Sequence, residues 1–429
     1  MNYLRLFGWI AALASTCGMS AAQELSRLVV ADERADWGQP APYLHAMNGP
    51  GYVWMTFLFD ALLGQDERGA PVPALATEWT VSEDGLVYDL SLNTQARWHD
   101  GEDVTAEDVV FTFNYVQDHP HPFVPLNMVS EVTADGERAR VTLSRPDPGF
   151  VSTVLMSLPI LPEHVYADVA EPRDFVGPEA RTGTGPFTLA NADRAQGRYT
   201  LQAFEGYYGN PSAFEELLFV RMAPDTALRA MADGEVDLFT YLPWRLVDQA
   251  RDLDIDLETA PSNHPVRVVF NHEGLFGALP ARRALAHSID RAALARIAYA
   301  GGATPARLGY FQDGTVWFSE DAQMAYAVDP ARAEALFETA GLSRDASGQW
   351  GDANGPVELR LITDGRTQRA AIVVSEALES AGFTVDLRVL ERGAMQEAAA
   401  SRDFDLALMT TSTIGDPGGL IRRGLGGNW

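Results

Sequence analysis

The stretch that decides the fold runs from Trp98 to Phe113 and reads WHDGEDVTAEDVVFTF. Asp100-Gly101 predicts a tight turn, because glycine tolerates positive φ and aspartate hydrogen-bonds its own backbone. Thr105 is followed three residues later by Asp108, which is a capping-box pattern for the start of a helix. The apolar residues after it recur at helical spacing: Val109, Phe113 and Val116. The stretch therefore predicts the end of a strand, a tight turn and a capped helix.

The first 22 residues have the pattern of a secretory signal peptide. Arg5 supplies a positive charge, and the mostly apolar run at 6–13 is too short to span a bilayer. Small residues then precede Gln23 and fit cleavage before it. The only cysteine of the chain, Cys17, lies inside this leader. We therefore expect an exported protein whose mature chain has neither disulfides nor thiol chemistry.

The composition is typical of a folded, secreted globular protein. Hydrophobic residues make up 46% of the chain, and no second apolar run is long enough for a membrane helix. The formal net charge is −27, which repels phosphate backbones and anionic lipid head groups. We therefore expect neither a nucleic-acid partner nor direct membrane insertion. We interpret the negative charge as a means of solubility and not as a sign of a cationic ligand. The charge by itself does not locate a binding site.

Local patterns predict several further elements. Strands are expected at 28–31, 86–92, 187–189, 199–204, 383–390 and 404–408, because apolar and polar residues alternate or form short apolar runs there. Residues 132–143 predict two strands joined by a turn with Asp-Gly at its centre. Helices are expected within 52–63, over 227–232, over 282–291 and over 371–378.

Seven segments in register resemble one family. Besides 98–113 they are PALATEW at 73–79, DGLVY at 84–88, GTGPF at 183–187, YYGNP at 207–211, GEVDL at 234–238 and RRALAHSIDR at 282–291. In this order they resemble the dipeptide and oligopeptide class, family 5, of extracytoplasmic solute-binding proteins of ABC transporters. In the last segment Ser288 stands where the family pattern has alanine.

The resemblance implies an α/β fold of the two-lobed periplasmic-binding-protein type, class II-like, with a subdomain inserted in the first lobe. The expected division is a signal peptide at 1–22, a discontinuous first lobe at 23–57 and 171–262, the inserted subdomain at 58–170, and a second lobe at 263–429. Family members continue further and send their last segment back into the first lobe. We therefore expect that the C-terminal return segment is missing from this chain.

The resemblance also implies a cleft lined by aromatic residues and a few polar groups. The residues that we expect to bind ligand are Tyr52, Trp54, Tyr241, Trp244, Arg245, Ser412, Thr413 and Asp416. Core packing is the alternative for each aromatic residue, and a surface salt bridge is the alternative for Arg245. In the peptide-binding branch, an aspartate in the loop of Asp416 receives the ligand's terminal ammonium. Here the acidic position is held by Ser412 or Thr413, whose hydroxyls suit a sugar or another neutral ligand equally well.

No catalytic or metal motif stands out in the chain. His119 and His121 form the only close histidine pair, and we find no nucleophile, zinc or phosphate-loop pattern. Together with the resemblance, which alone implies a monomer, a peptide or similar polar ligand and delivery to an ABC permease and ATPase complex, this predicts a periplasmic binding protein without enzymatic activity or cofactor. The alternatives are a protein that binds an oligosaccharide or a nickel complex, a sensory binding protein without a transport role, and, least favoured, a periplasmic hydrolase.

Overall fold

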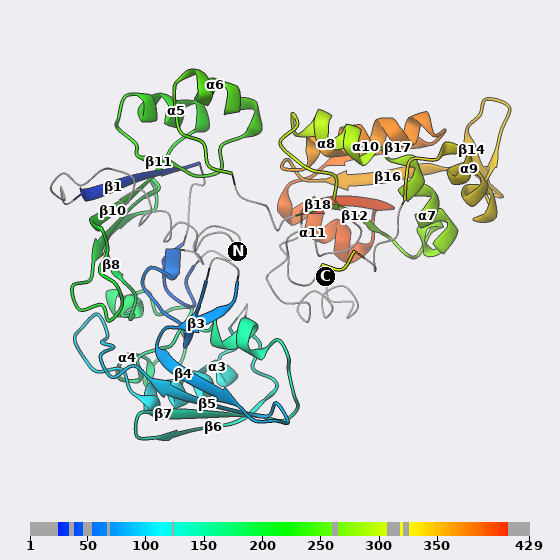
Figure 1. Ribbon diagram of the computed structural model, residues 1–429. Coiled ribbons are helices and arrows are strands. Elements are labelled where there is room, and N and C mark those ends of the chain that lie inside the picture. The colour runs from blue at the N-terminus through cyan, green and yellow to red at the C-terminus, as the bar shows by residue number, and fades with distance from the viewer. Residues whose placement is uncertain are drawn as a thin grey trace. The chain divides into compact units, whose positions relative to one another are not determined.

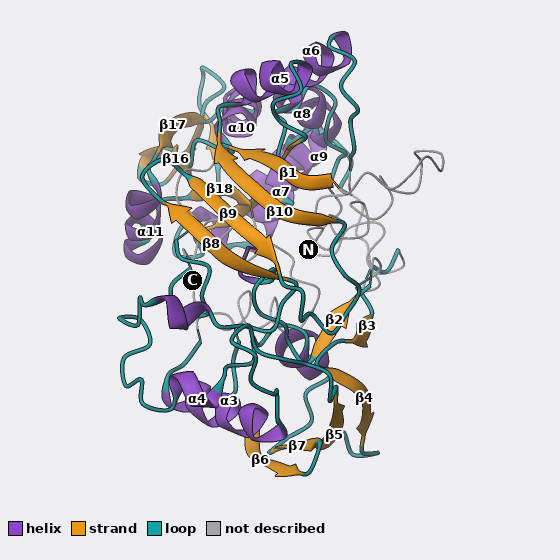
Figure 2. Cartoon of the chain, turned by 90° about the vertical axis from the view of Figure 1, so that its left-hand side faces the viewer, coloured by secondary structure: helices purple, strands orange, loops and turns teal. Residues whose placement is uncertain are grey.

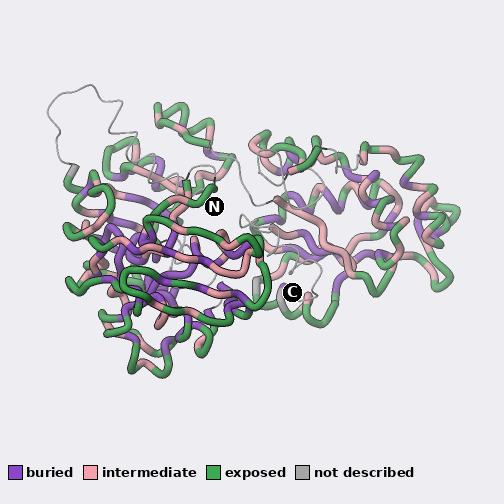
Figure 3. Tube along the Cα trace, turned by 60° about the horizontal axis from the view of Figure 1, so that its bottom comes forward, coloured by how far each residue is buried: buried purple, intermediate pink, exposed green. Residues whose placement is uncertain are grey.

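The computed structural model describes residues 25–33, 38–45, 54–66, 69–121, 124–259, 265–306, 318–320 and 326–410. The chain forms two compact units, Met1–Ala260 and Pro261–Trp429. Buried residues gather in the interior of each unit, and exposed residues follow its loops (Figure 3). No helix among these described residues is both long and apolar enough to span a bilayer.

The first unit contains a five-stranded sheet with the order β11-β1-β10-β9-β8. Its strands are β1 (Leu25–Asp32), β8 (Phe187–Asp193), β9 (Arg198–Ala203), β10 (Phe214–Arg221) and β11 (Leu238–Phe239). β1 pairs in parallel with both β10 and β11, while β10, β9 and β8 are antiparallel. Val30 packs in an aromatic cluster on one face of β1, whereas Ala31 packs against the helix residues Ala227 and Ala230 on the other. Both faces of the central strand are therefore buried.

Short helices lie beside β11, which is an edge strand of this sheet. They are α5 (Pro224–Ala232), the 3-10 helix Trp244–Leu246 and α6 (Val247–Asp252). Figure 1 shows α5 and α6 beside β1 and β11. Leu228 of α5 packs with Leu246 and with Ala250 of α6, so the two helices share one small core.

A second sheet of the first unit has the order β4-β5-β7-β6. It consists of β4 (Ala76–Val81), β5 (Val87–Leu92), β6 (Val129–Asp135) and β7 (Arg138–Leu143), and a small ribbon is formed by β2 (Leu63–Gln65) and β3 (Pro71–Pro73). The helix α3 (Ala106–Asp118) lies along this sheet, and the short helix α4 (Glu163–Tyr166) lies beside α3 (Figure 2). The π-helical turn Val151–Leu155 and the 3-10 turn Pro178–Arg181 complete this part.

The opening stretch of the sequence forms the tight turn and the capped helix that it predicts, but not the end of a strand. β5 ends at Leu92, and before the turn Arg97 makes only an isolated β-bridge with Asp103. The Thr105 side chain accepts a hydrogen bond from the Asp108 amide, and the Asp108 carboxylate accepts one from the Thr105 amide. This capping box starts α3 because it satisfies two amides that have no partner inside the helix. Val109 and Phe113 are fully buried in the core beneath the helix.

His99 joins this stretch to the segment before β8. Its Nδ1 accepts a hydrogen bond from the Gly183 amide at 3.2 Å, and its Nε2 donates one to the Gly185 carbonyl at 3.0 Å. These two bonds require a neutral ring protonated on Nε2. Burial accordingly lowers the pKa of His99. A Cβ atom on Gly183 would overlap the carbonyl of Leu58, so this position has room only for glycine.

The second unit has a four-stranded sheet with the order β12-β18-β16-β17. Its strands are β12 (Val266–Phe270), β16 (Glu358–Thr363), β17 (Thr384–Val389) and β18 (Leu406–Thr410), and a small sheet is formed by β13 (Ser343–Arg344), β14 (Trp350–Asp352) and β15 (Gly355–Pro356). Its helices are the 3-10 helix Leu275–Gly277, α7 (Leu279–Ser288), α8 (Arg291–Ala298), α9 (Pro330–Thr339), α10 (Gln368–Ser380) and α11 (Arg392–Ser401).

Successive residues of the central strands of this sheet pack into different cores. Leu361 lies in the cluster that contains Val374 of α10, whereas Ile362 lies in the cluster that contains Met395 of α11. Parallel strands buried on both faces are typical of sheets covered by helices on both sides.

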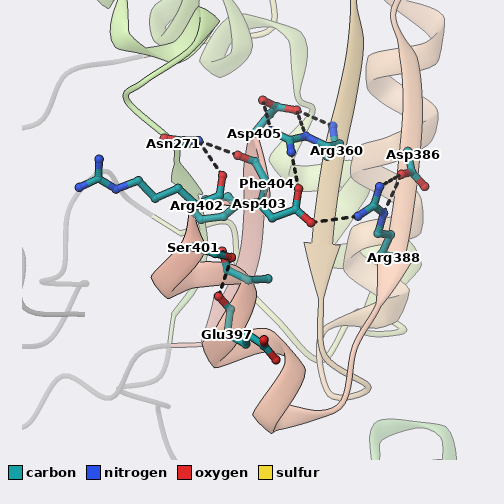
Figure 4. A network of polar contacts seen from close by, with 11 residues as sticks. Asn271, Arg360, Asp386, Arg388, Glu397, Ser401, Arg402, Asp403, Phe404 and Asp405 are labelled. Carbon is teal, nitrogen blue, oxygen red and sulfur yellow. Dashed lines mark hydrogen bonds and ion pairs between the residues drawn. The ribbon is translucent and has the colours of Figure 1, made fainter.

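A network of ion pairs anchors the start of β18 (Figure 4). Arg360 of β16 bonds both Asp403 and Asp405, and Arg388 of β17 bonds Asp403 and Asp386. These contacts fix the segment before β18 to β16, its neighbour in the sheet, and to β17 beyond it.

Most of the other predicted elements are confirmed, and two of them need correction. The run at 282–291 is not one helix, because α7 ends at Ser288 and the Asp290 side chain caps the separate helix α8. The apolar run at 52–63 was expected to enter a helix, but its described part has only a helical turn at 54–58 before β2. Its apolar side chains instead fill the core under the sheet.

Candidate ligand-binding site

The parallel strands β1, β10 and β11 end at one edge of the first unit's sheet. Ligands of open α/β sheets bind outside the carboxyl ends of such strands. At this edge β1 ends with Asp32, which is 1% exposed, and Thr240 follows directly after β11. The Thr240 hydroxyl donates to the Asp32 carboxylate at 2.7 Å, and its amide donates to the Ala31 carbonyl at 3.2 Å. The segment after β11 is thereby fixed to the end of β1.

Tyr241 and Trp244 form an aromatic corner in this segment. Tyr241 is 52% exposed and has a φ of 61°, and Trp244 is 41% exposed at the start of a 3-10 helix. Leu242, between them, packs with Leu228 and Leu246. We use the name aromatic corner for the segment 240–245.

Arg245 closes the corner through an ion pair with Asp225 in the first turn of α5. Its two terminal nitrogens donate to the two carboxylate oxygens at 3.0 and 3.4 Å. The hydrogen bond from Arg245 lowers the pKa of Asp225, and the same bond raises the pKa of Arg245. The surface salt bridge that stood as the alternative for Arg245 is therefore present.

Trp54 lies in the core of the first unit and not at this edge. It is 4% exposed, stacks on Phe57 and has its ring centroid 3.9 Å from that of Phe219. The surroundings of Trp54 therefore agree with the alternative interpretation of this residue, which is core packing.

Four of the expected site residues lie outside the described residues: Tyr52, Ser412, Thr413 and Asp416. Three of them, Ser412, Thr413 and Asp416, follow in the sequence within a few residues of β18, which ends at Thr410. Next to it, at the carboxyl end of β16, Thr367 donates to the Leu408 carbonyl and Arg366 bonds Asp364 at 2.6 Å. Although burial acts in the opposite direction, the hydrogen bond and charge of Arg366 lower the pKa of Asp364.

Sequence reasoning missed the polar partners of the aromatic corner, Asp32, Asp225 and Thr240. An acidic residue directly after the apolar run Leu28–Ala31 was an available signal for Asp32, because carboxyl ends of strands carry functional groups. Asp225 had no such signal, since it lies 20 residues before its partner.

Histidines elsewhere in the first unit are engaged in the fold. His121 is buried and its Nε2 bonds the Pro42 carbonyl at 3.0 Å. Burial, with a contribution from the neighbouring His45, lowers its pKa to about 4. Within the described ranges no group of three or more His, Cys, Asp or Glu side chains is placed to hold a metal ion.

Comparison with known proteins gives one family. The model of bacterial extracellular solute-binding proteins, family 5, matches residues 70–426. A putative ABC transporter peptide-binding protein of Brucella ovis is 30% identical over 336 residues, which are 73% of this chain and 59% of that protein. The dipeptide-binding protein of Escherichia coli is 26% identical over 64% of this chain and 56% of its own length. The chain thus spans less than two thirds of the length of these relatives.

The fold is matched by solved structures. NikA from Brucella suis, in complex with Fe(III)-EDTA, superposes with a TM-score of 0.79 at 19% identity, covering 92% of this chain and 81% of that chain. The predicted fold class, α/β of the periplasmic-binding-protein type, is confirmed by this match.

Proposed function

Because the chain belongs to family 5 of the bacterial extracellular solute-binding proteins, we propose that it captures a small polar ligand, in the first place a peptide, for an ABC importer. The ligand is enclosed between two lobes and handed to a membrane permease and its ATPase. The protein acts by binding and catalyses no reaction. It is exported by its leader, works as a monomer outside the cytoplasm and needs no cofactor.

The observation that carries this proposal in the structure is the aromatic corner at the carboxyl edge of β1 and β11. Tyr241 and Trp244 keep large exposed ring surfaces there, in a segment that Asp32 and Asp225 hold in place. Small-molecule sites are lined mainly by apolar and aromatic side chains with a few placed polar groups, and the corner supplies side chains of both kinds. Peptide is preferred as the ligand class because the relatives from Brucella ovis and Escherichia coli are named peptide-binding and dipeptide-binding proteins.

The proposed site combines this corner with the residues predicted from the sequence. Tyr241 and Trp244 contact the ligand, and Arg245 positions them through Asp225. Tyr52, Ser412, Thr413 and Asp416 remain predicted ligand contacts. Trp54 is not among the proposed ligand contacts, since it packs in the core against Phe219.

A thermal-shift screen tests the proposal. The full chain, exported and purified from the periplasm of a bacterial host, is melted with di- to hexapeptides, oligosaccharides and nickel chelates. A ligand that binds only the native state raises the melting temperature with the logarithm of its concentration. A shift with peptides supports the proposal. A shift with only sugars or nickel chelates replaces the ligand class, and a cooperative melt that no compound shifts contradicts the proposal.

Two variants test whether the peptide binds at the aromatic corner. Trp244→Ala is expected to weaken the peptide shift, because it removes exposed ring surface at the corner. The matched control is Val81→Ala, which removes exposed apolar surface on β4 of the same unit and leaves the shift unchanged. An equal loss in both variants would place the binding elsewhere.

A further inference from the structure

The first unit has a surface groove that shares no residue with the aromatic corner. The groove has a volume of about 640 Å³ and is lined by α3, by α4 with the residues that follow it, and by Ala134 of β6. The helices α3 and α4 lie side by side (Figure 2). We call this feature the α3 groove.

One whole face of α3 forms a wall of the α3 groove. The residues of this face are Glu107, Val110, Phe111, Asn114, Tyr115 and Asp118. They recur at intervals of three and four residues, so they lie on one side of the helix, from its first turn to its last. The opposite face, with Val109 and Phe113, is buried in the core. The sheet thus covers one face of α3, and the other face borders the groove.

The apolar residues of the α3 groove lie deeper than its charged residues. Val110, Phe111 and Val169 are half-buried, and Tyr115 is buried, while the carboxylates that line the groove are exposed. The Tyr115 hydroxyl donates to the Val169 carbonyl at 2.8 Å and so ties α3 to the opposite wall. The groove therefore has an apolar floor that is fixed in place.

The charge of the α3 groove has one sign. Its carboxylates are Glu107, Asp118, Glu163 and Asp168, and none of the residues that line it is lysine or arginine. Within the described part of the chain, none of these four side chains makes a hydrogen bond or an ion pair. The helix dipole favours Glu107 in the first turn of α3 but disfavours Asp118 in the last turn. The fold therefore gives no reason for a carboxylate at 118.

An acidic rim around an apolar floor complements a segment that has cationic side chains on one face and apolar side chains on the other. Such a helix in a groove is a recurrent way to recognise a protein partner. Glu107 and Asp118 are roughly 16 Å apart along the helix axis, more than the approximately 10 Å of an extended tripeptide. A second copy of this chain, with its net charge of −27, would be repelled.

We propose that the α3 groove docks a basic amphipathic helix of another protein, about three turns long. The apolar side chains of this helix cover Val110 and Phe111, and its cationic side chains pair with Glu107 and Asp118. The proposal goes beyond ligand capture, because it concerns a protein partner at a different surface of the first unit.

A labelled dodecapeptide with leucines on one helical face and arginines on the other is the probe. Its binding to the full chain is followed by fluorescence anisotropy and compared with that of a shuffled peptide of the same composition. We expect the amphipathic peptide to bind about threefold to tenfold more tightly than the shuffled one. No binding, or equal binding of the two peptides, would overturn the proposal.

Variants locate the binding. Glu107→Gln combined with Asp118→Asn is expected to weaken it about threefold to tenfold. The matched control combines Glu78→Gln with Glu83→Gln, which removes the same charge from exposed positions of the same unit and leaves the affinity unchanged. Equal weakening in both double variants would reduce the binding to the net charge of the chain and overturn the proposal.

Two further measurements separate docking from its alternatives. Val110→Ser is expected to weaken binding of the amphipathic peptide more than that of the shuffled one, and melting of the same samples shows whether the variant is folded. An unchanged preference in the folded variant would contradict the apolar contact. Displacement of the labelled peptide by an equal concentration of the tripeptide Ala-Arg-Ala would assign the groove to small cationic ligands and overturn the docking of a helix.

Discussion

Arg245 reaches back 20 residues to Asp225 and bonds both of its carboxylate oxygens, at 3.0 and 3.4 Å. Both side chains are about half exposed, so the pair contributes little to global stability. Its effect is local, because it ties the 3-10 helix that carries Trp244 to the first turn of α5.

Breaking this pair is expected to affect binding more than stability. Asp225→Asn removes the charge that orients Arg245, so the aromatic corner gains freedom and its affinity for peptide falls. Titration and melting of the same samples check this. Asp248→Asn is the matched control, since it breaks the exposed Asp248–Arg251 pair of the same unit and leaves binding unchanged. Unaltered affinity in Asp225→Asn would show that the pair does not position the corner.

His121 is expected to make the first unit less stable in acid. Its pKa is lowered from 6.5 to about 4 in the folded chain, so between these values the unfolded chain binds the proton and the folded chain does not. The stability is therefore complete above about pH 6.5 and declines as the pH falls towards 4, by up to about 3 kcal/mol. Urea unfolding of the unaltered protein and of His121→Gln, at pH 7 and pH 4.5, measures this. The variant should lose less stability on acidification than the unaltered protein, and an equal loss in both would contradict the lowered pKa of His121.

Asp60 is expected to make the first unit less stable as the pH rises, which is the opposite direction to the effect of His121. Burial raises its pKa to about 7, while the hydrogen bond from Tyr208, 2.9 Å long, partly counteracts this. The unfolded chain loses this proton near pH 4 and the folded chain only near pH 7, so the stability contribution falls as the pH rises through this window.

Asp60→Asn should therefore stabilise the protein at pH 8, by up to roughly 4 kcal/mol, and flatten its pH dependence. Tyr208→Phe should have the reverse effect, because it removes the bond that favours the ionised carboxylate. Both are read from urea unfolding at pH 5 and pH 8. Equal pH dependence in all three proteins would contradict the shifted pKa of Asp60.

Gly183→Ala is expected to destabilise the first unit by several kcal/mol. The added Cβ overlaps the Leu58 carbonyl, and the displaced backbone would also break the bond between Gly183 and His99. Gly393→Ala is the matched control, because its Cβ meets no atom within 4 Å and it lies inside α11, where alanine gains up to about 1 kcal/mol over glycine. Thermal melts of the two variants should move in opposite directions.

Local chemistry explains which elements could be predicted. The Thr105–Asp108 box, the turn at Gly136 and the alternation over β5 each depend on residues a few positions apart, and the structure has all three. The break between α7 and α8 is local too. Asp290 is a good N-cap residue, so this signal was present within the run that was predicted as one helix.

The tertiary structure alone decided which aromatic residues are available at the surface. Trp54 and Trp244 stand in similar glycine- or proline-bounded segments, yet the first is 4% and the second 41% exposed. The difference arises because Phe219, 165 positions away in sequence, covers Trp54, and no local pattern encodes that contact.

The sequence by itself determined the family, the fold class and the tight turn with its capped helix, because these depend on motifs and on backbone preferences within a few residues. The tertiary structure decided the environment of the site. Thr240 meets Asp32 across 208 residues and Arg245 meets Asp225 across 20, on either side of Tyr241 in the sequence. Such contacts join side chains that become neighbours only when β1, β11 and α5 pack together, so their physical cause lies in the packing and not in the spacing of residues along the chain.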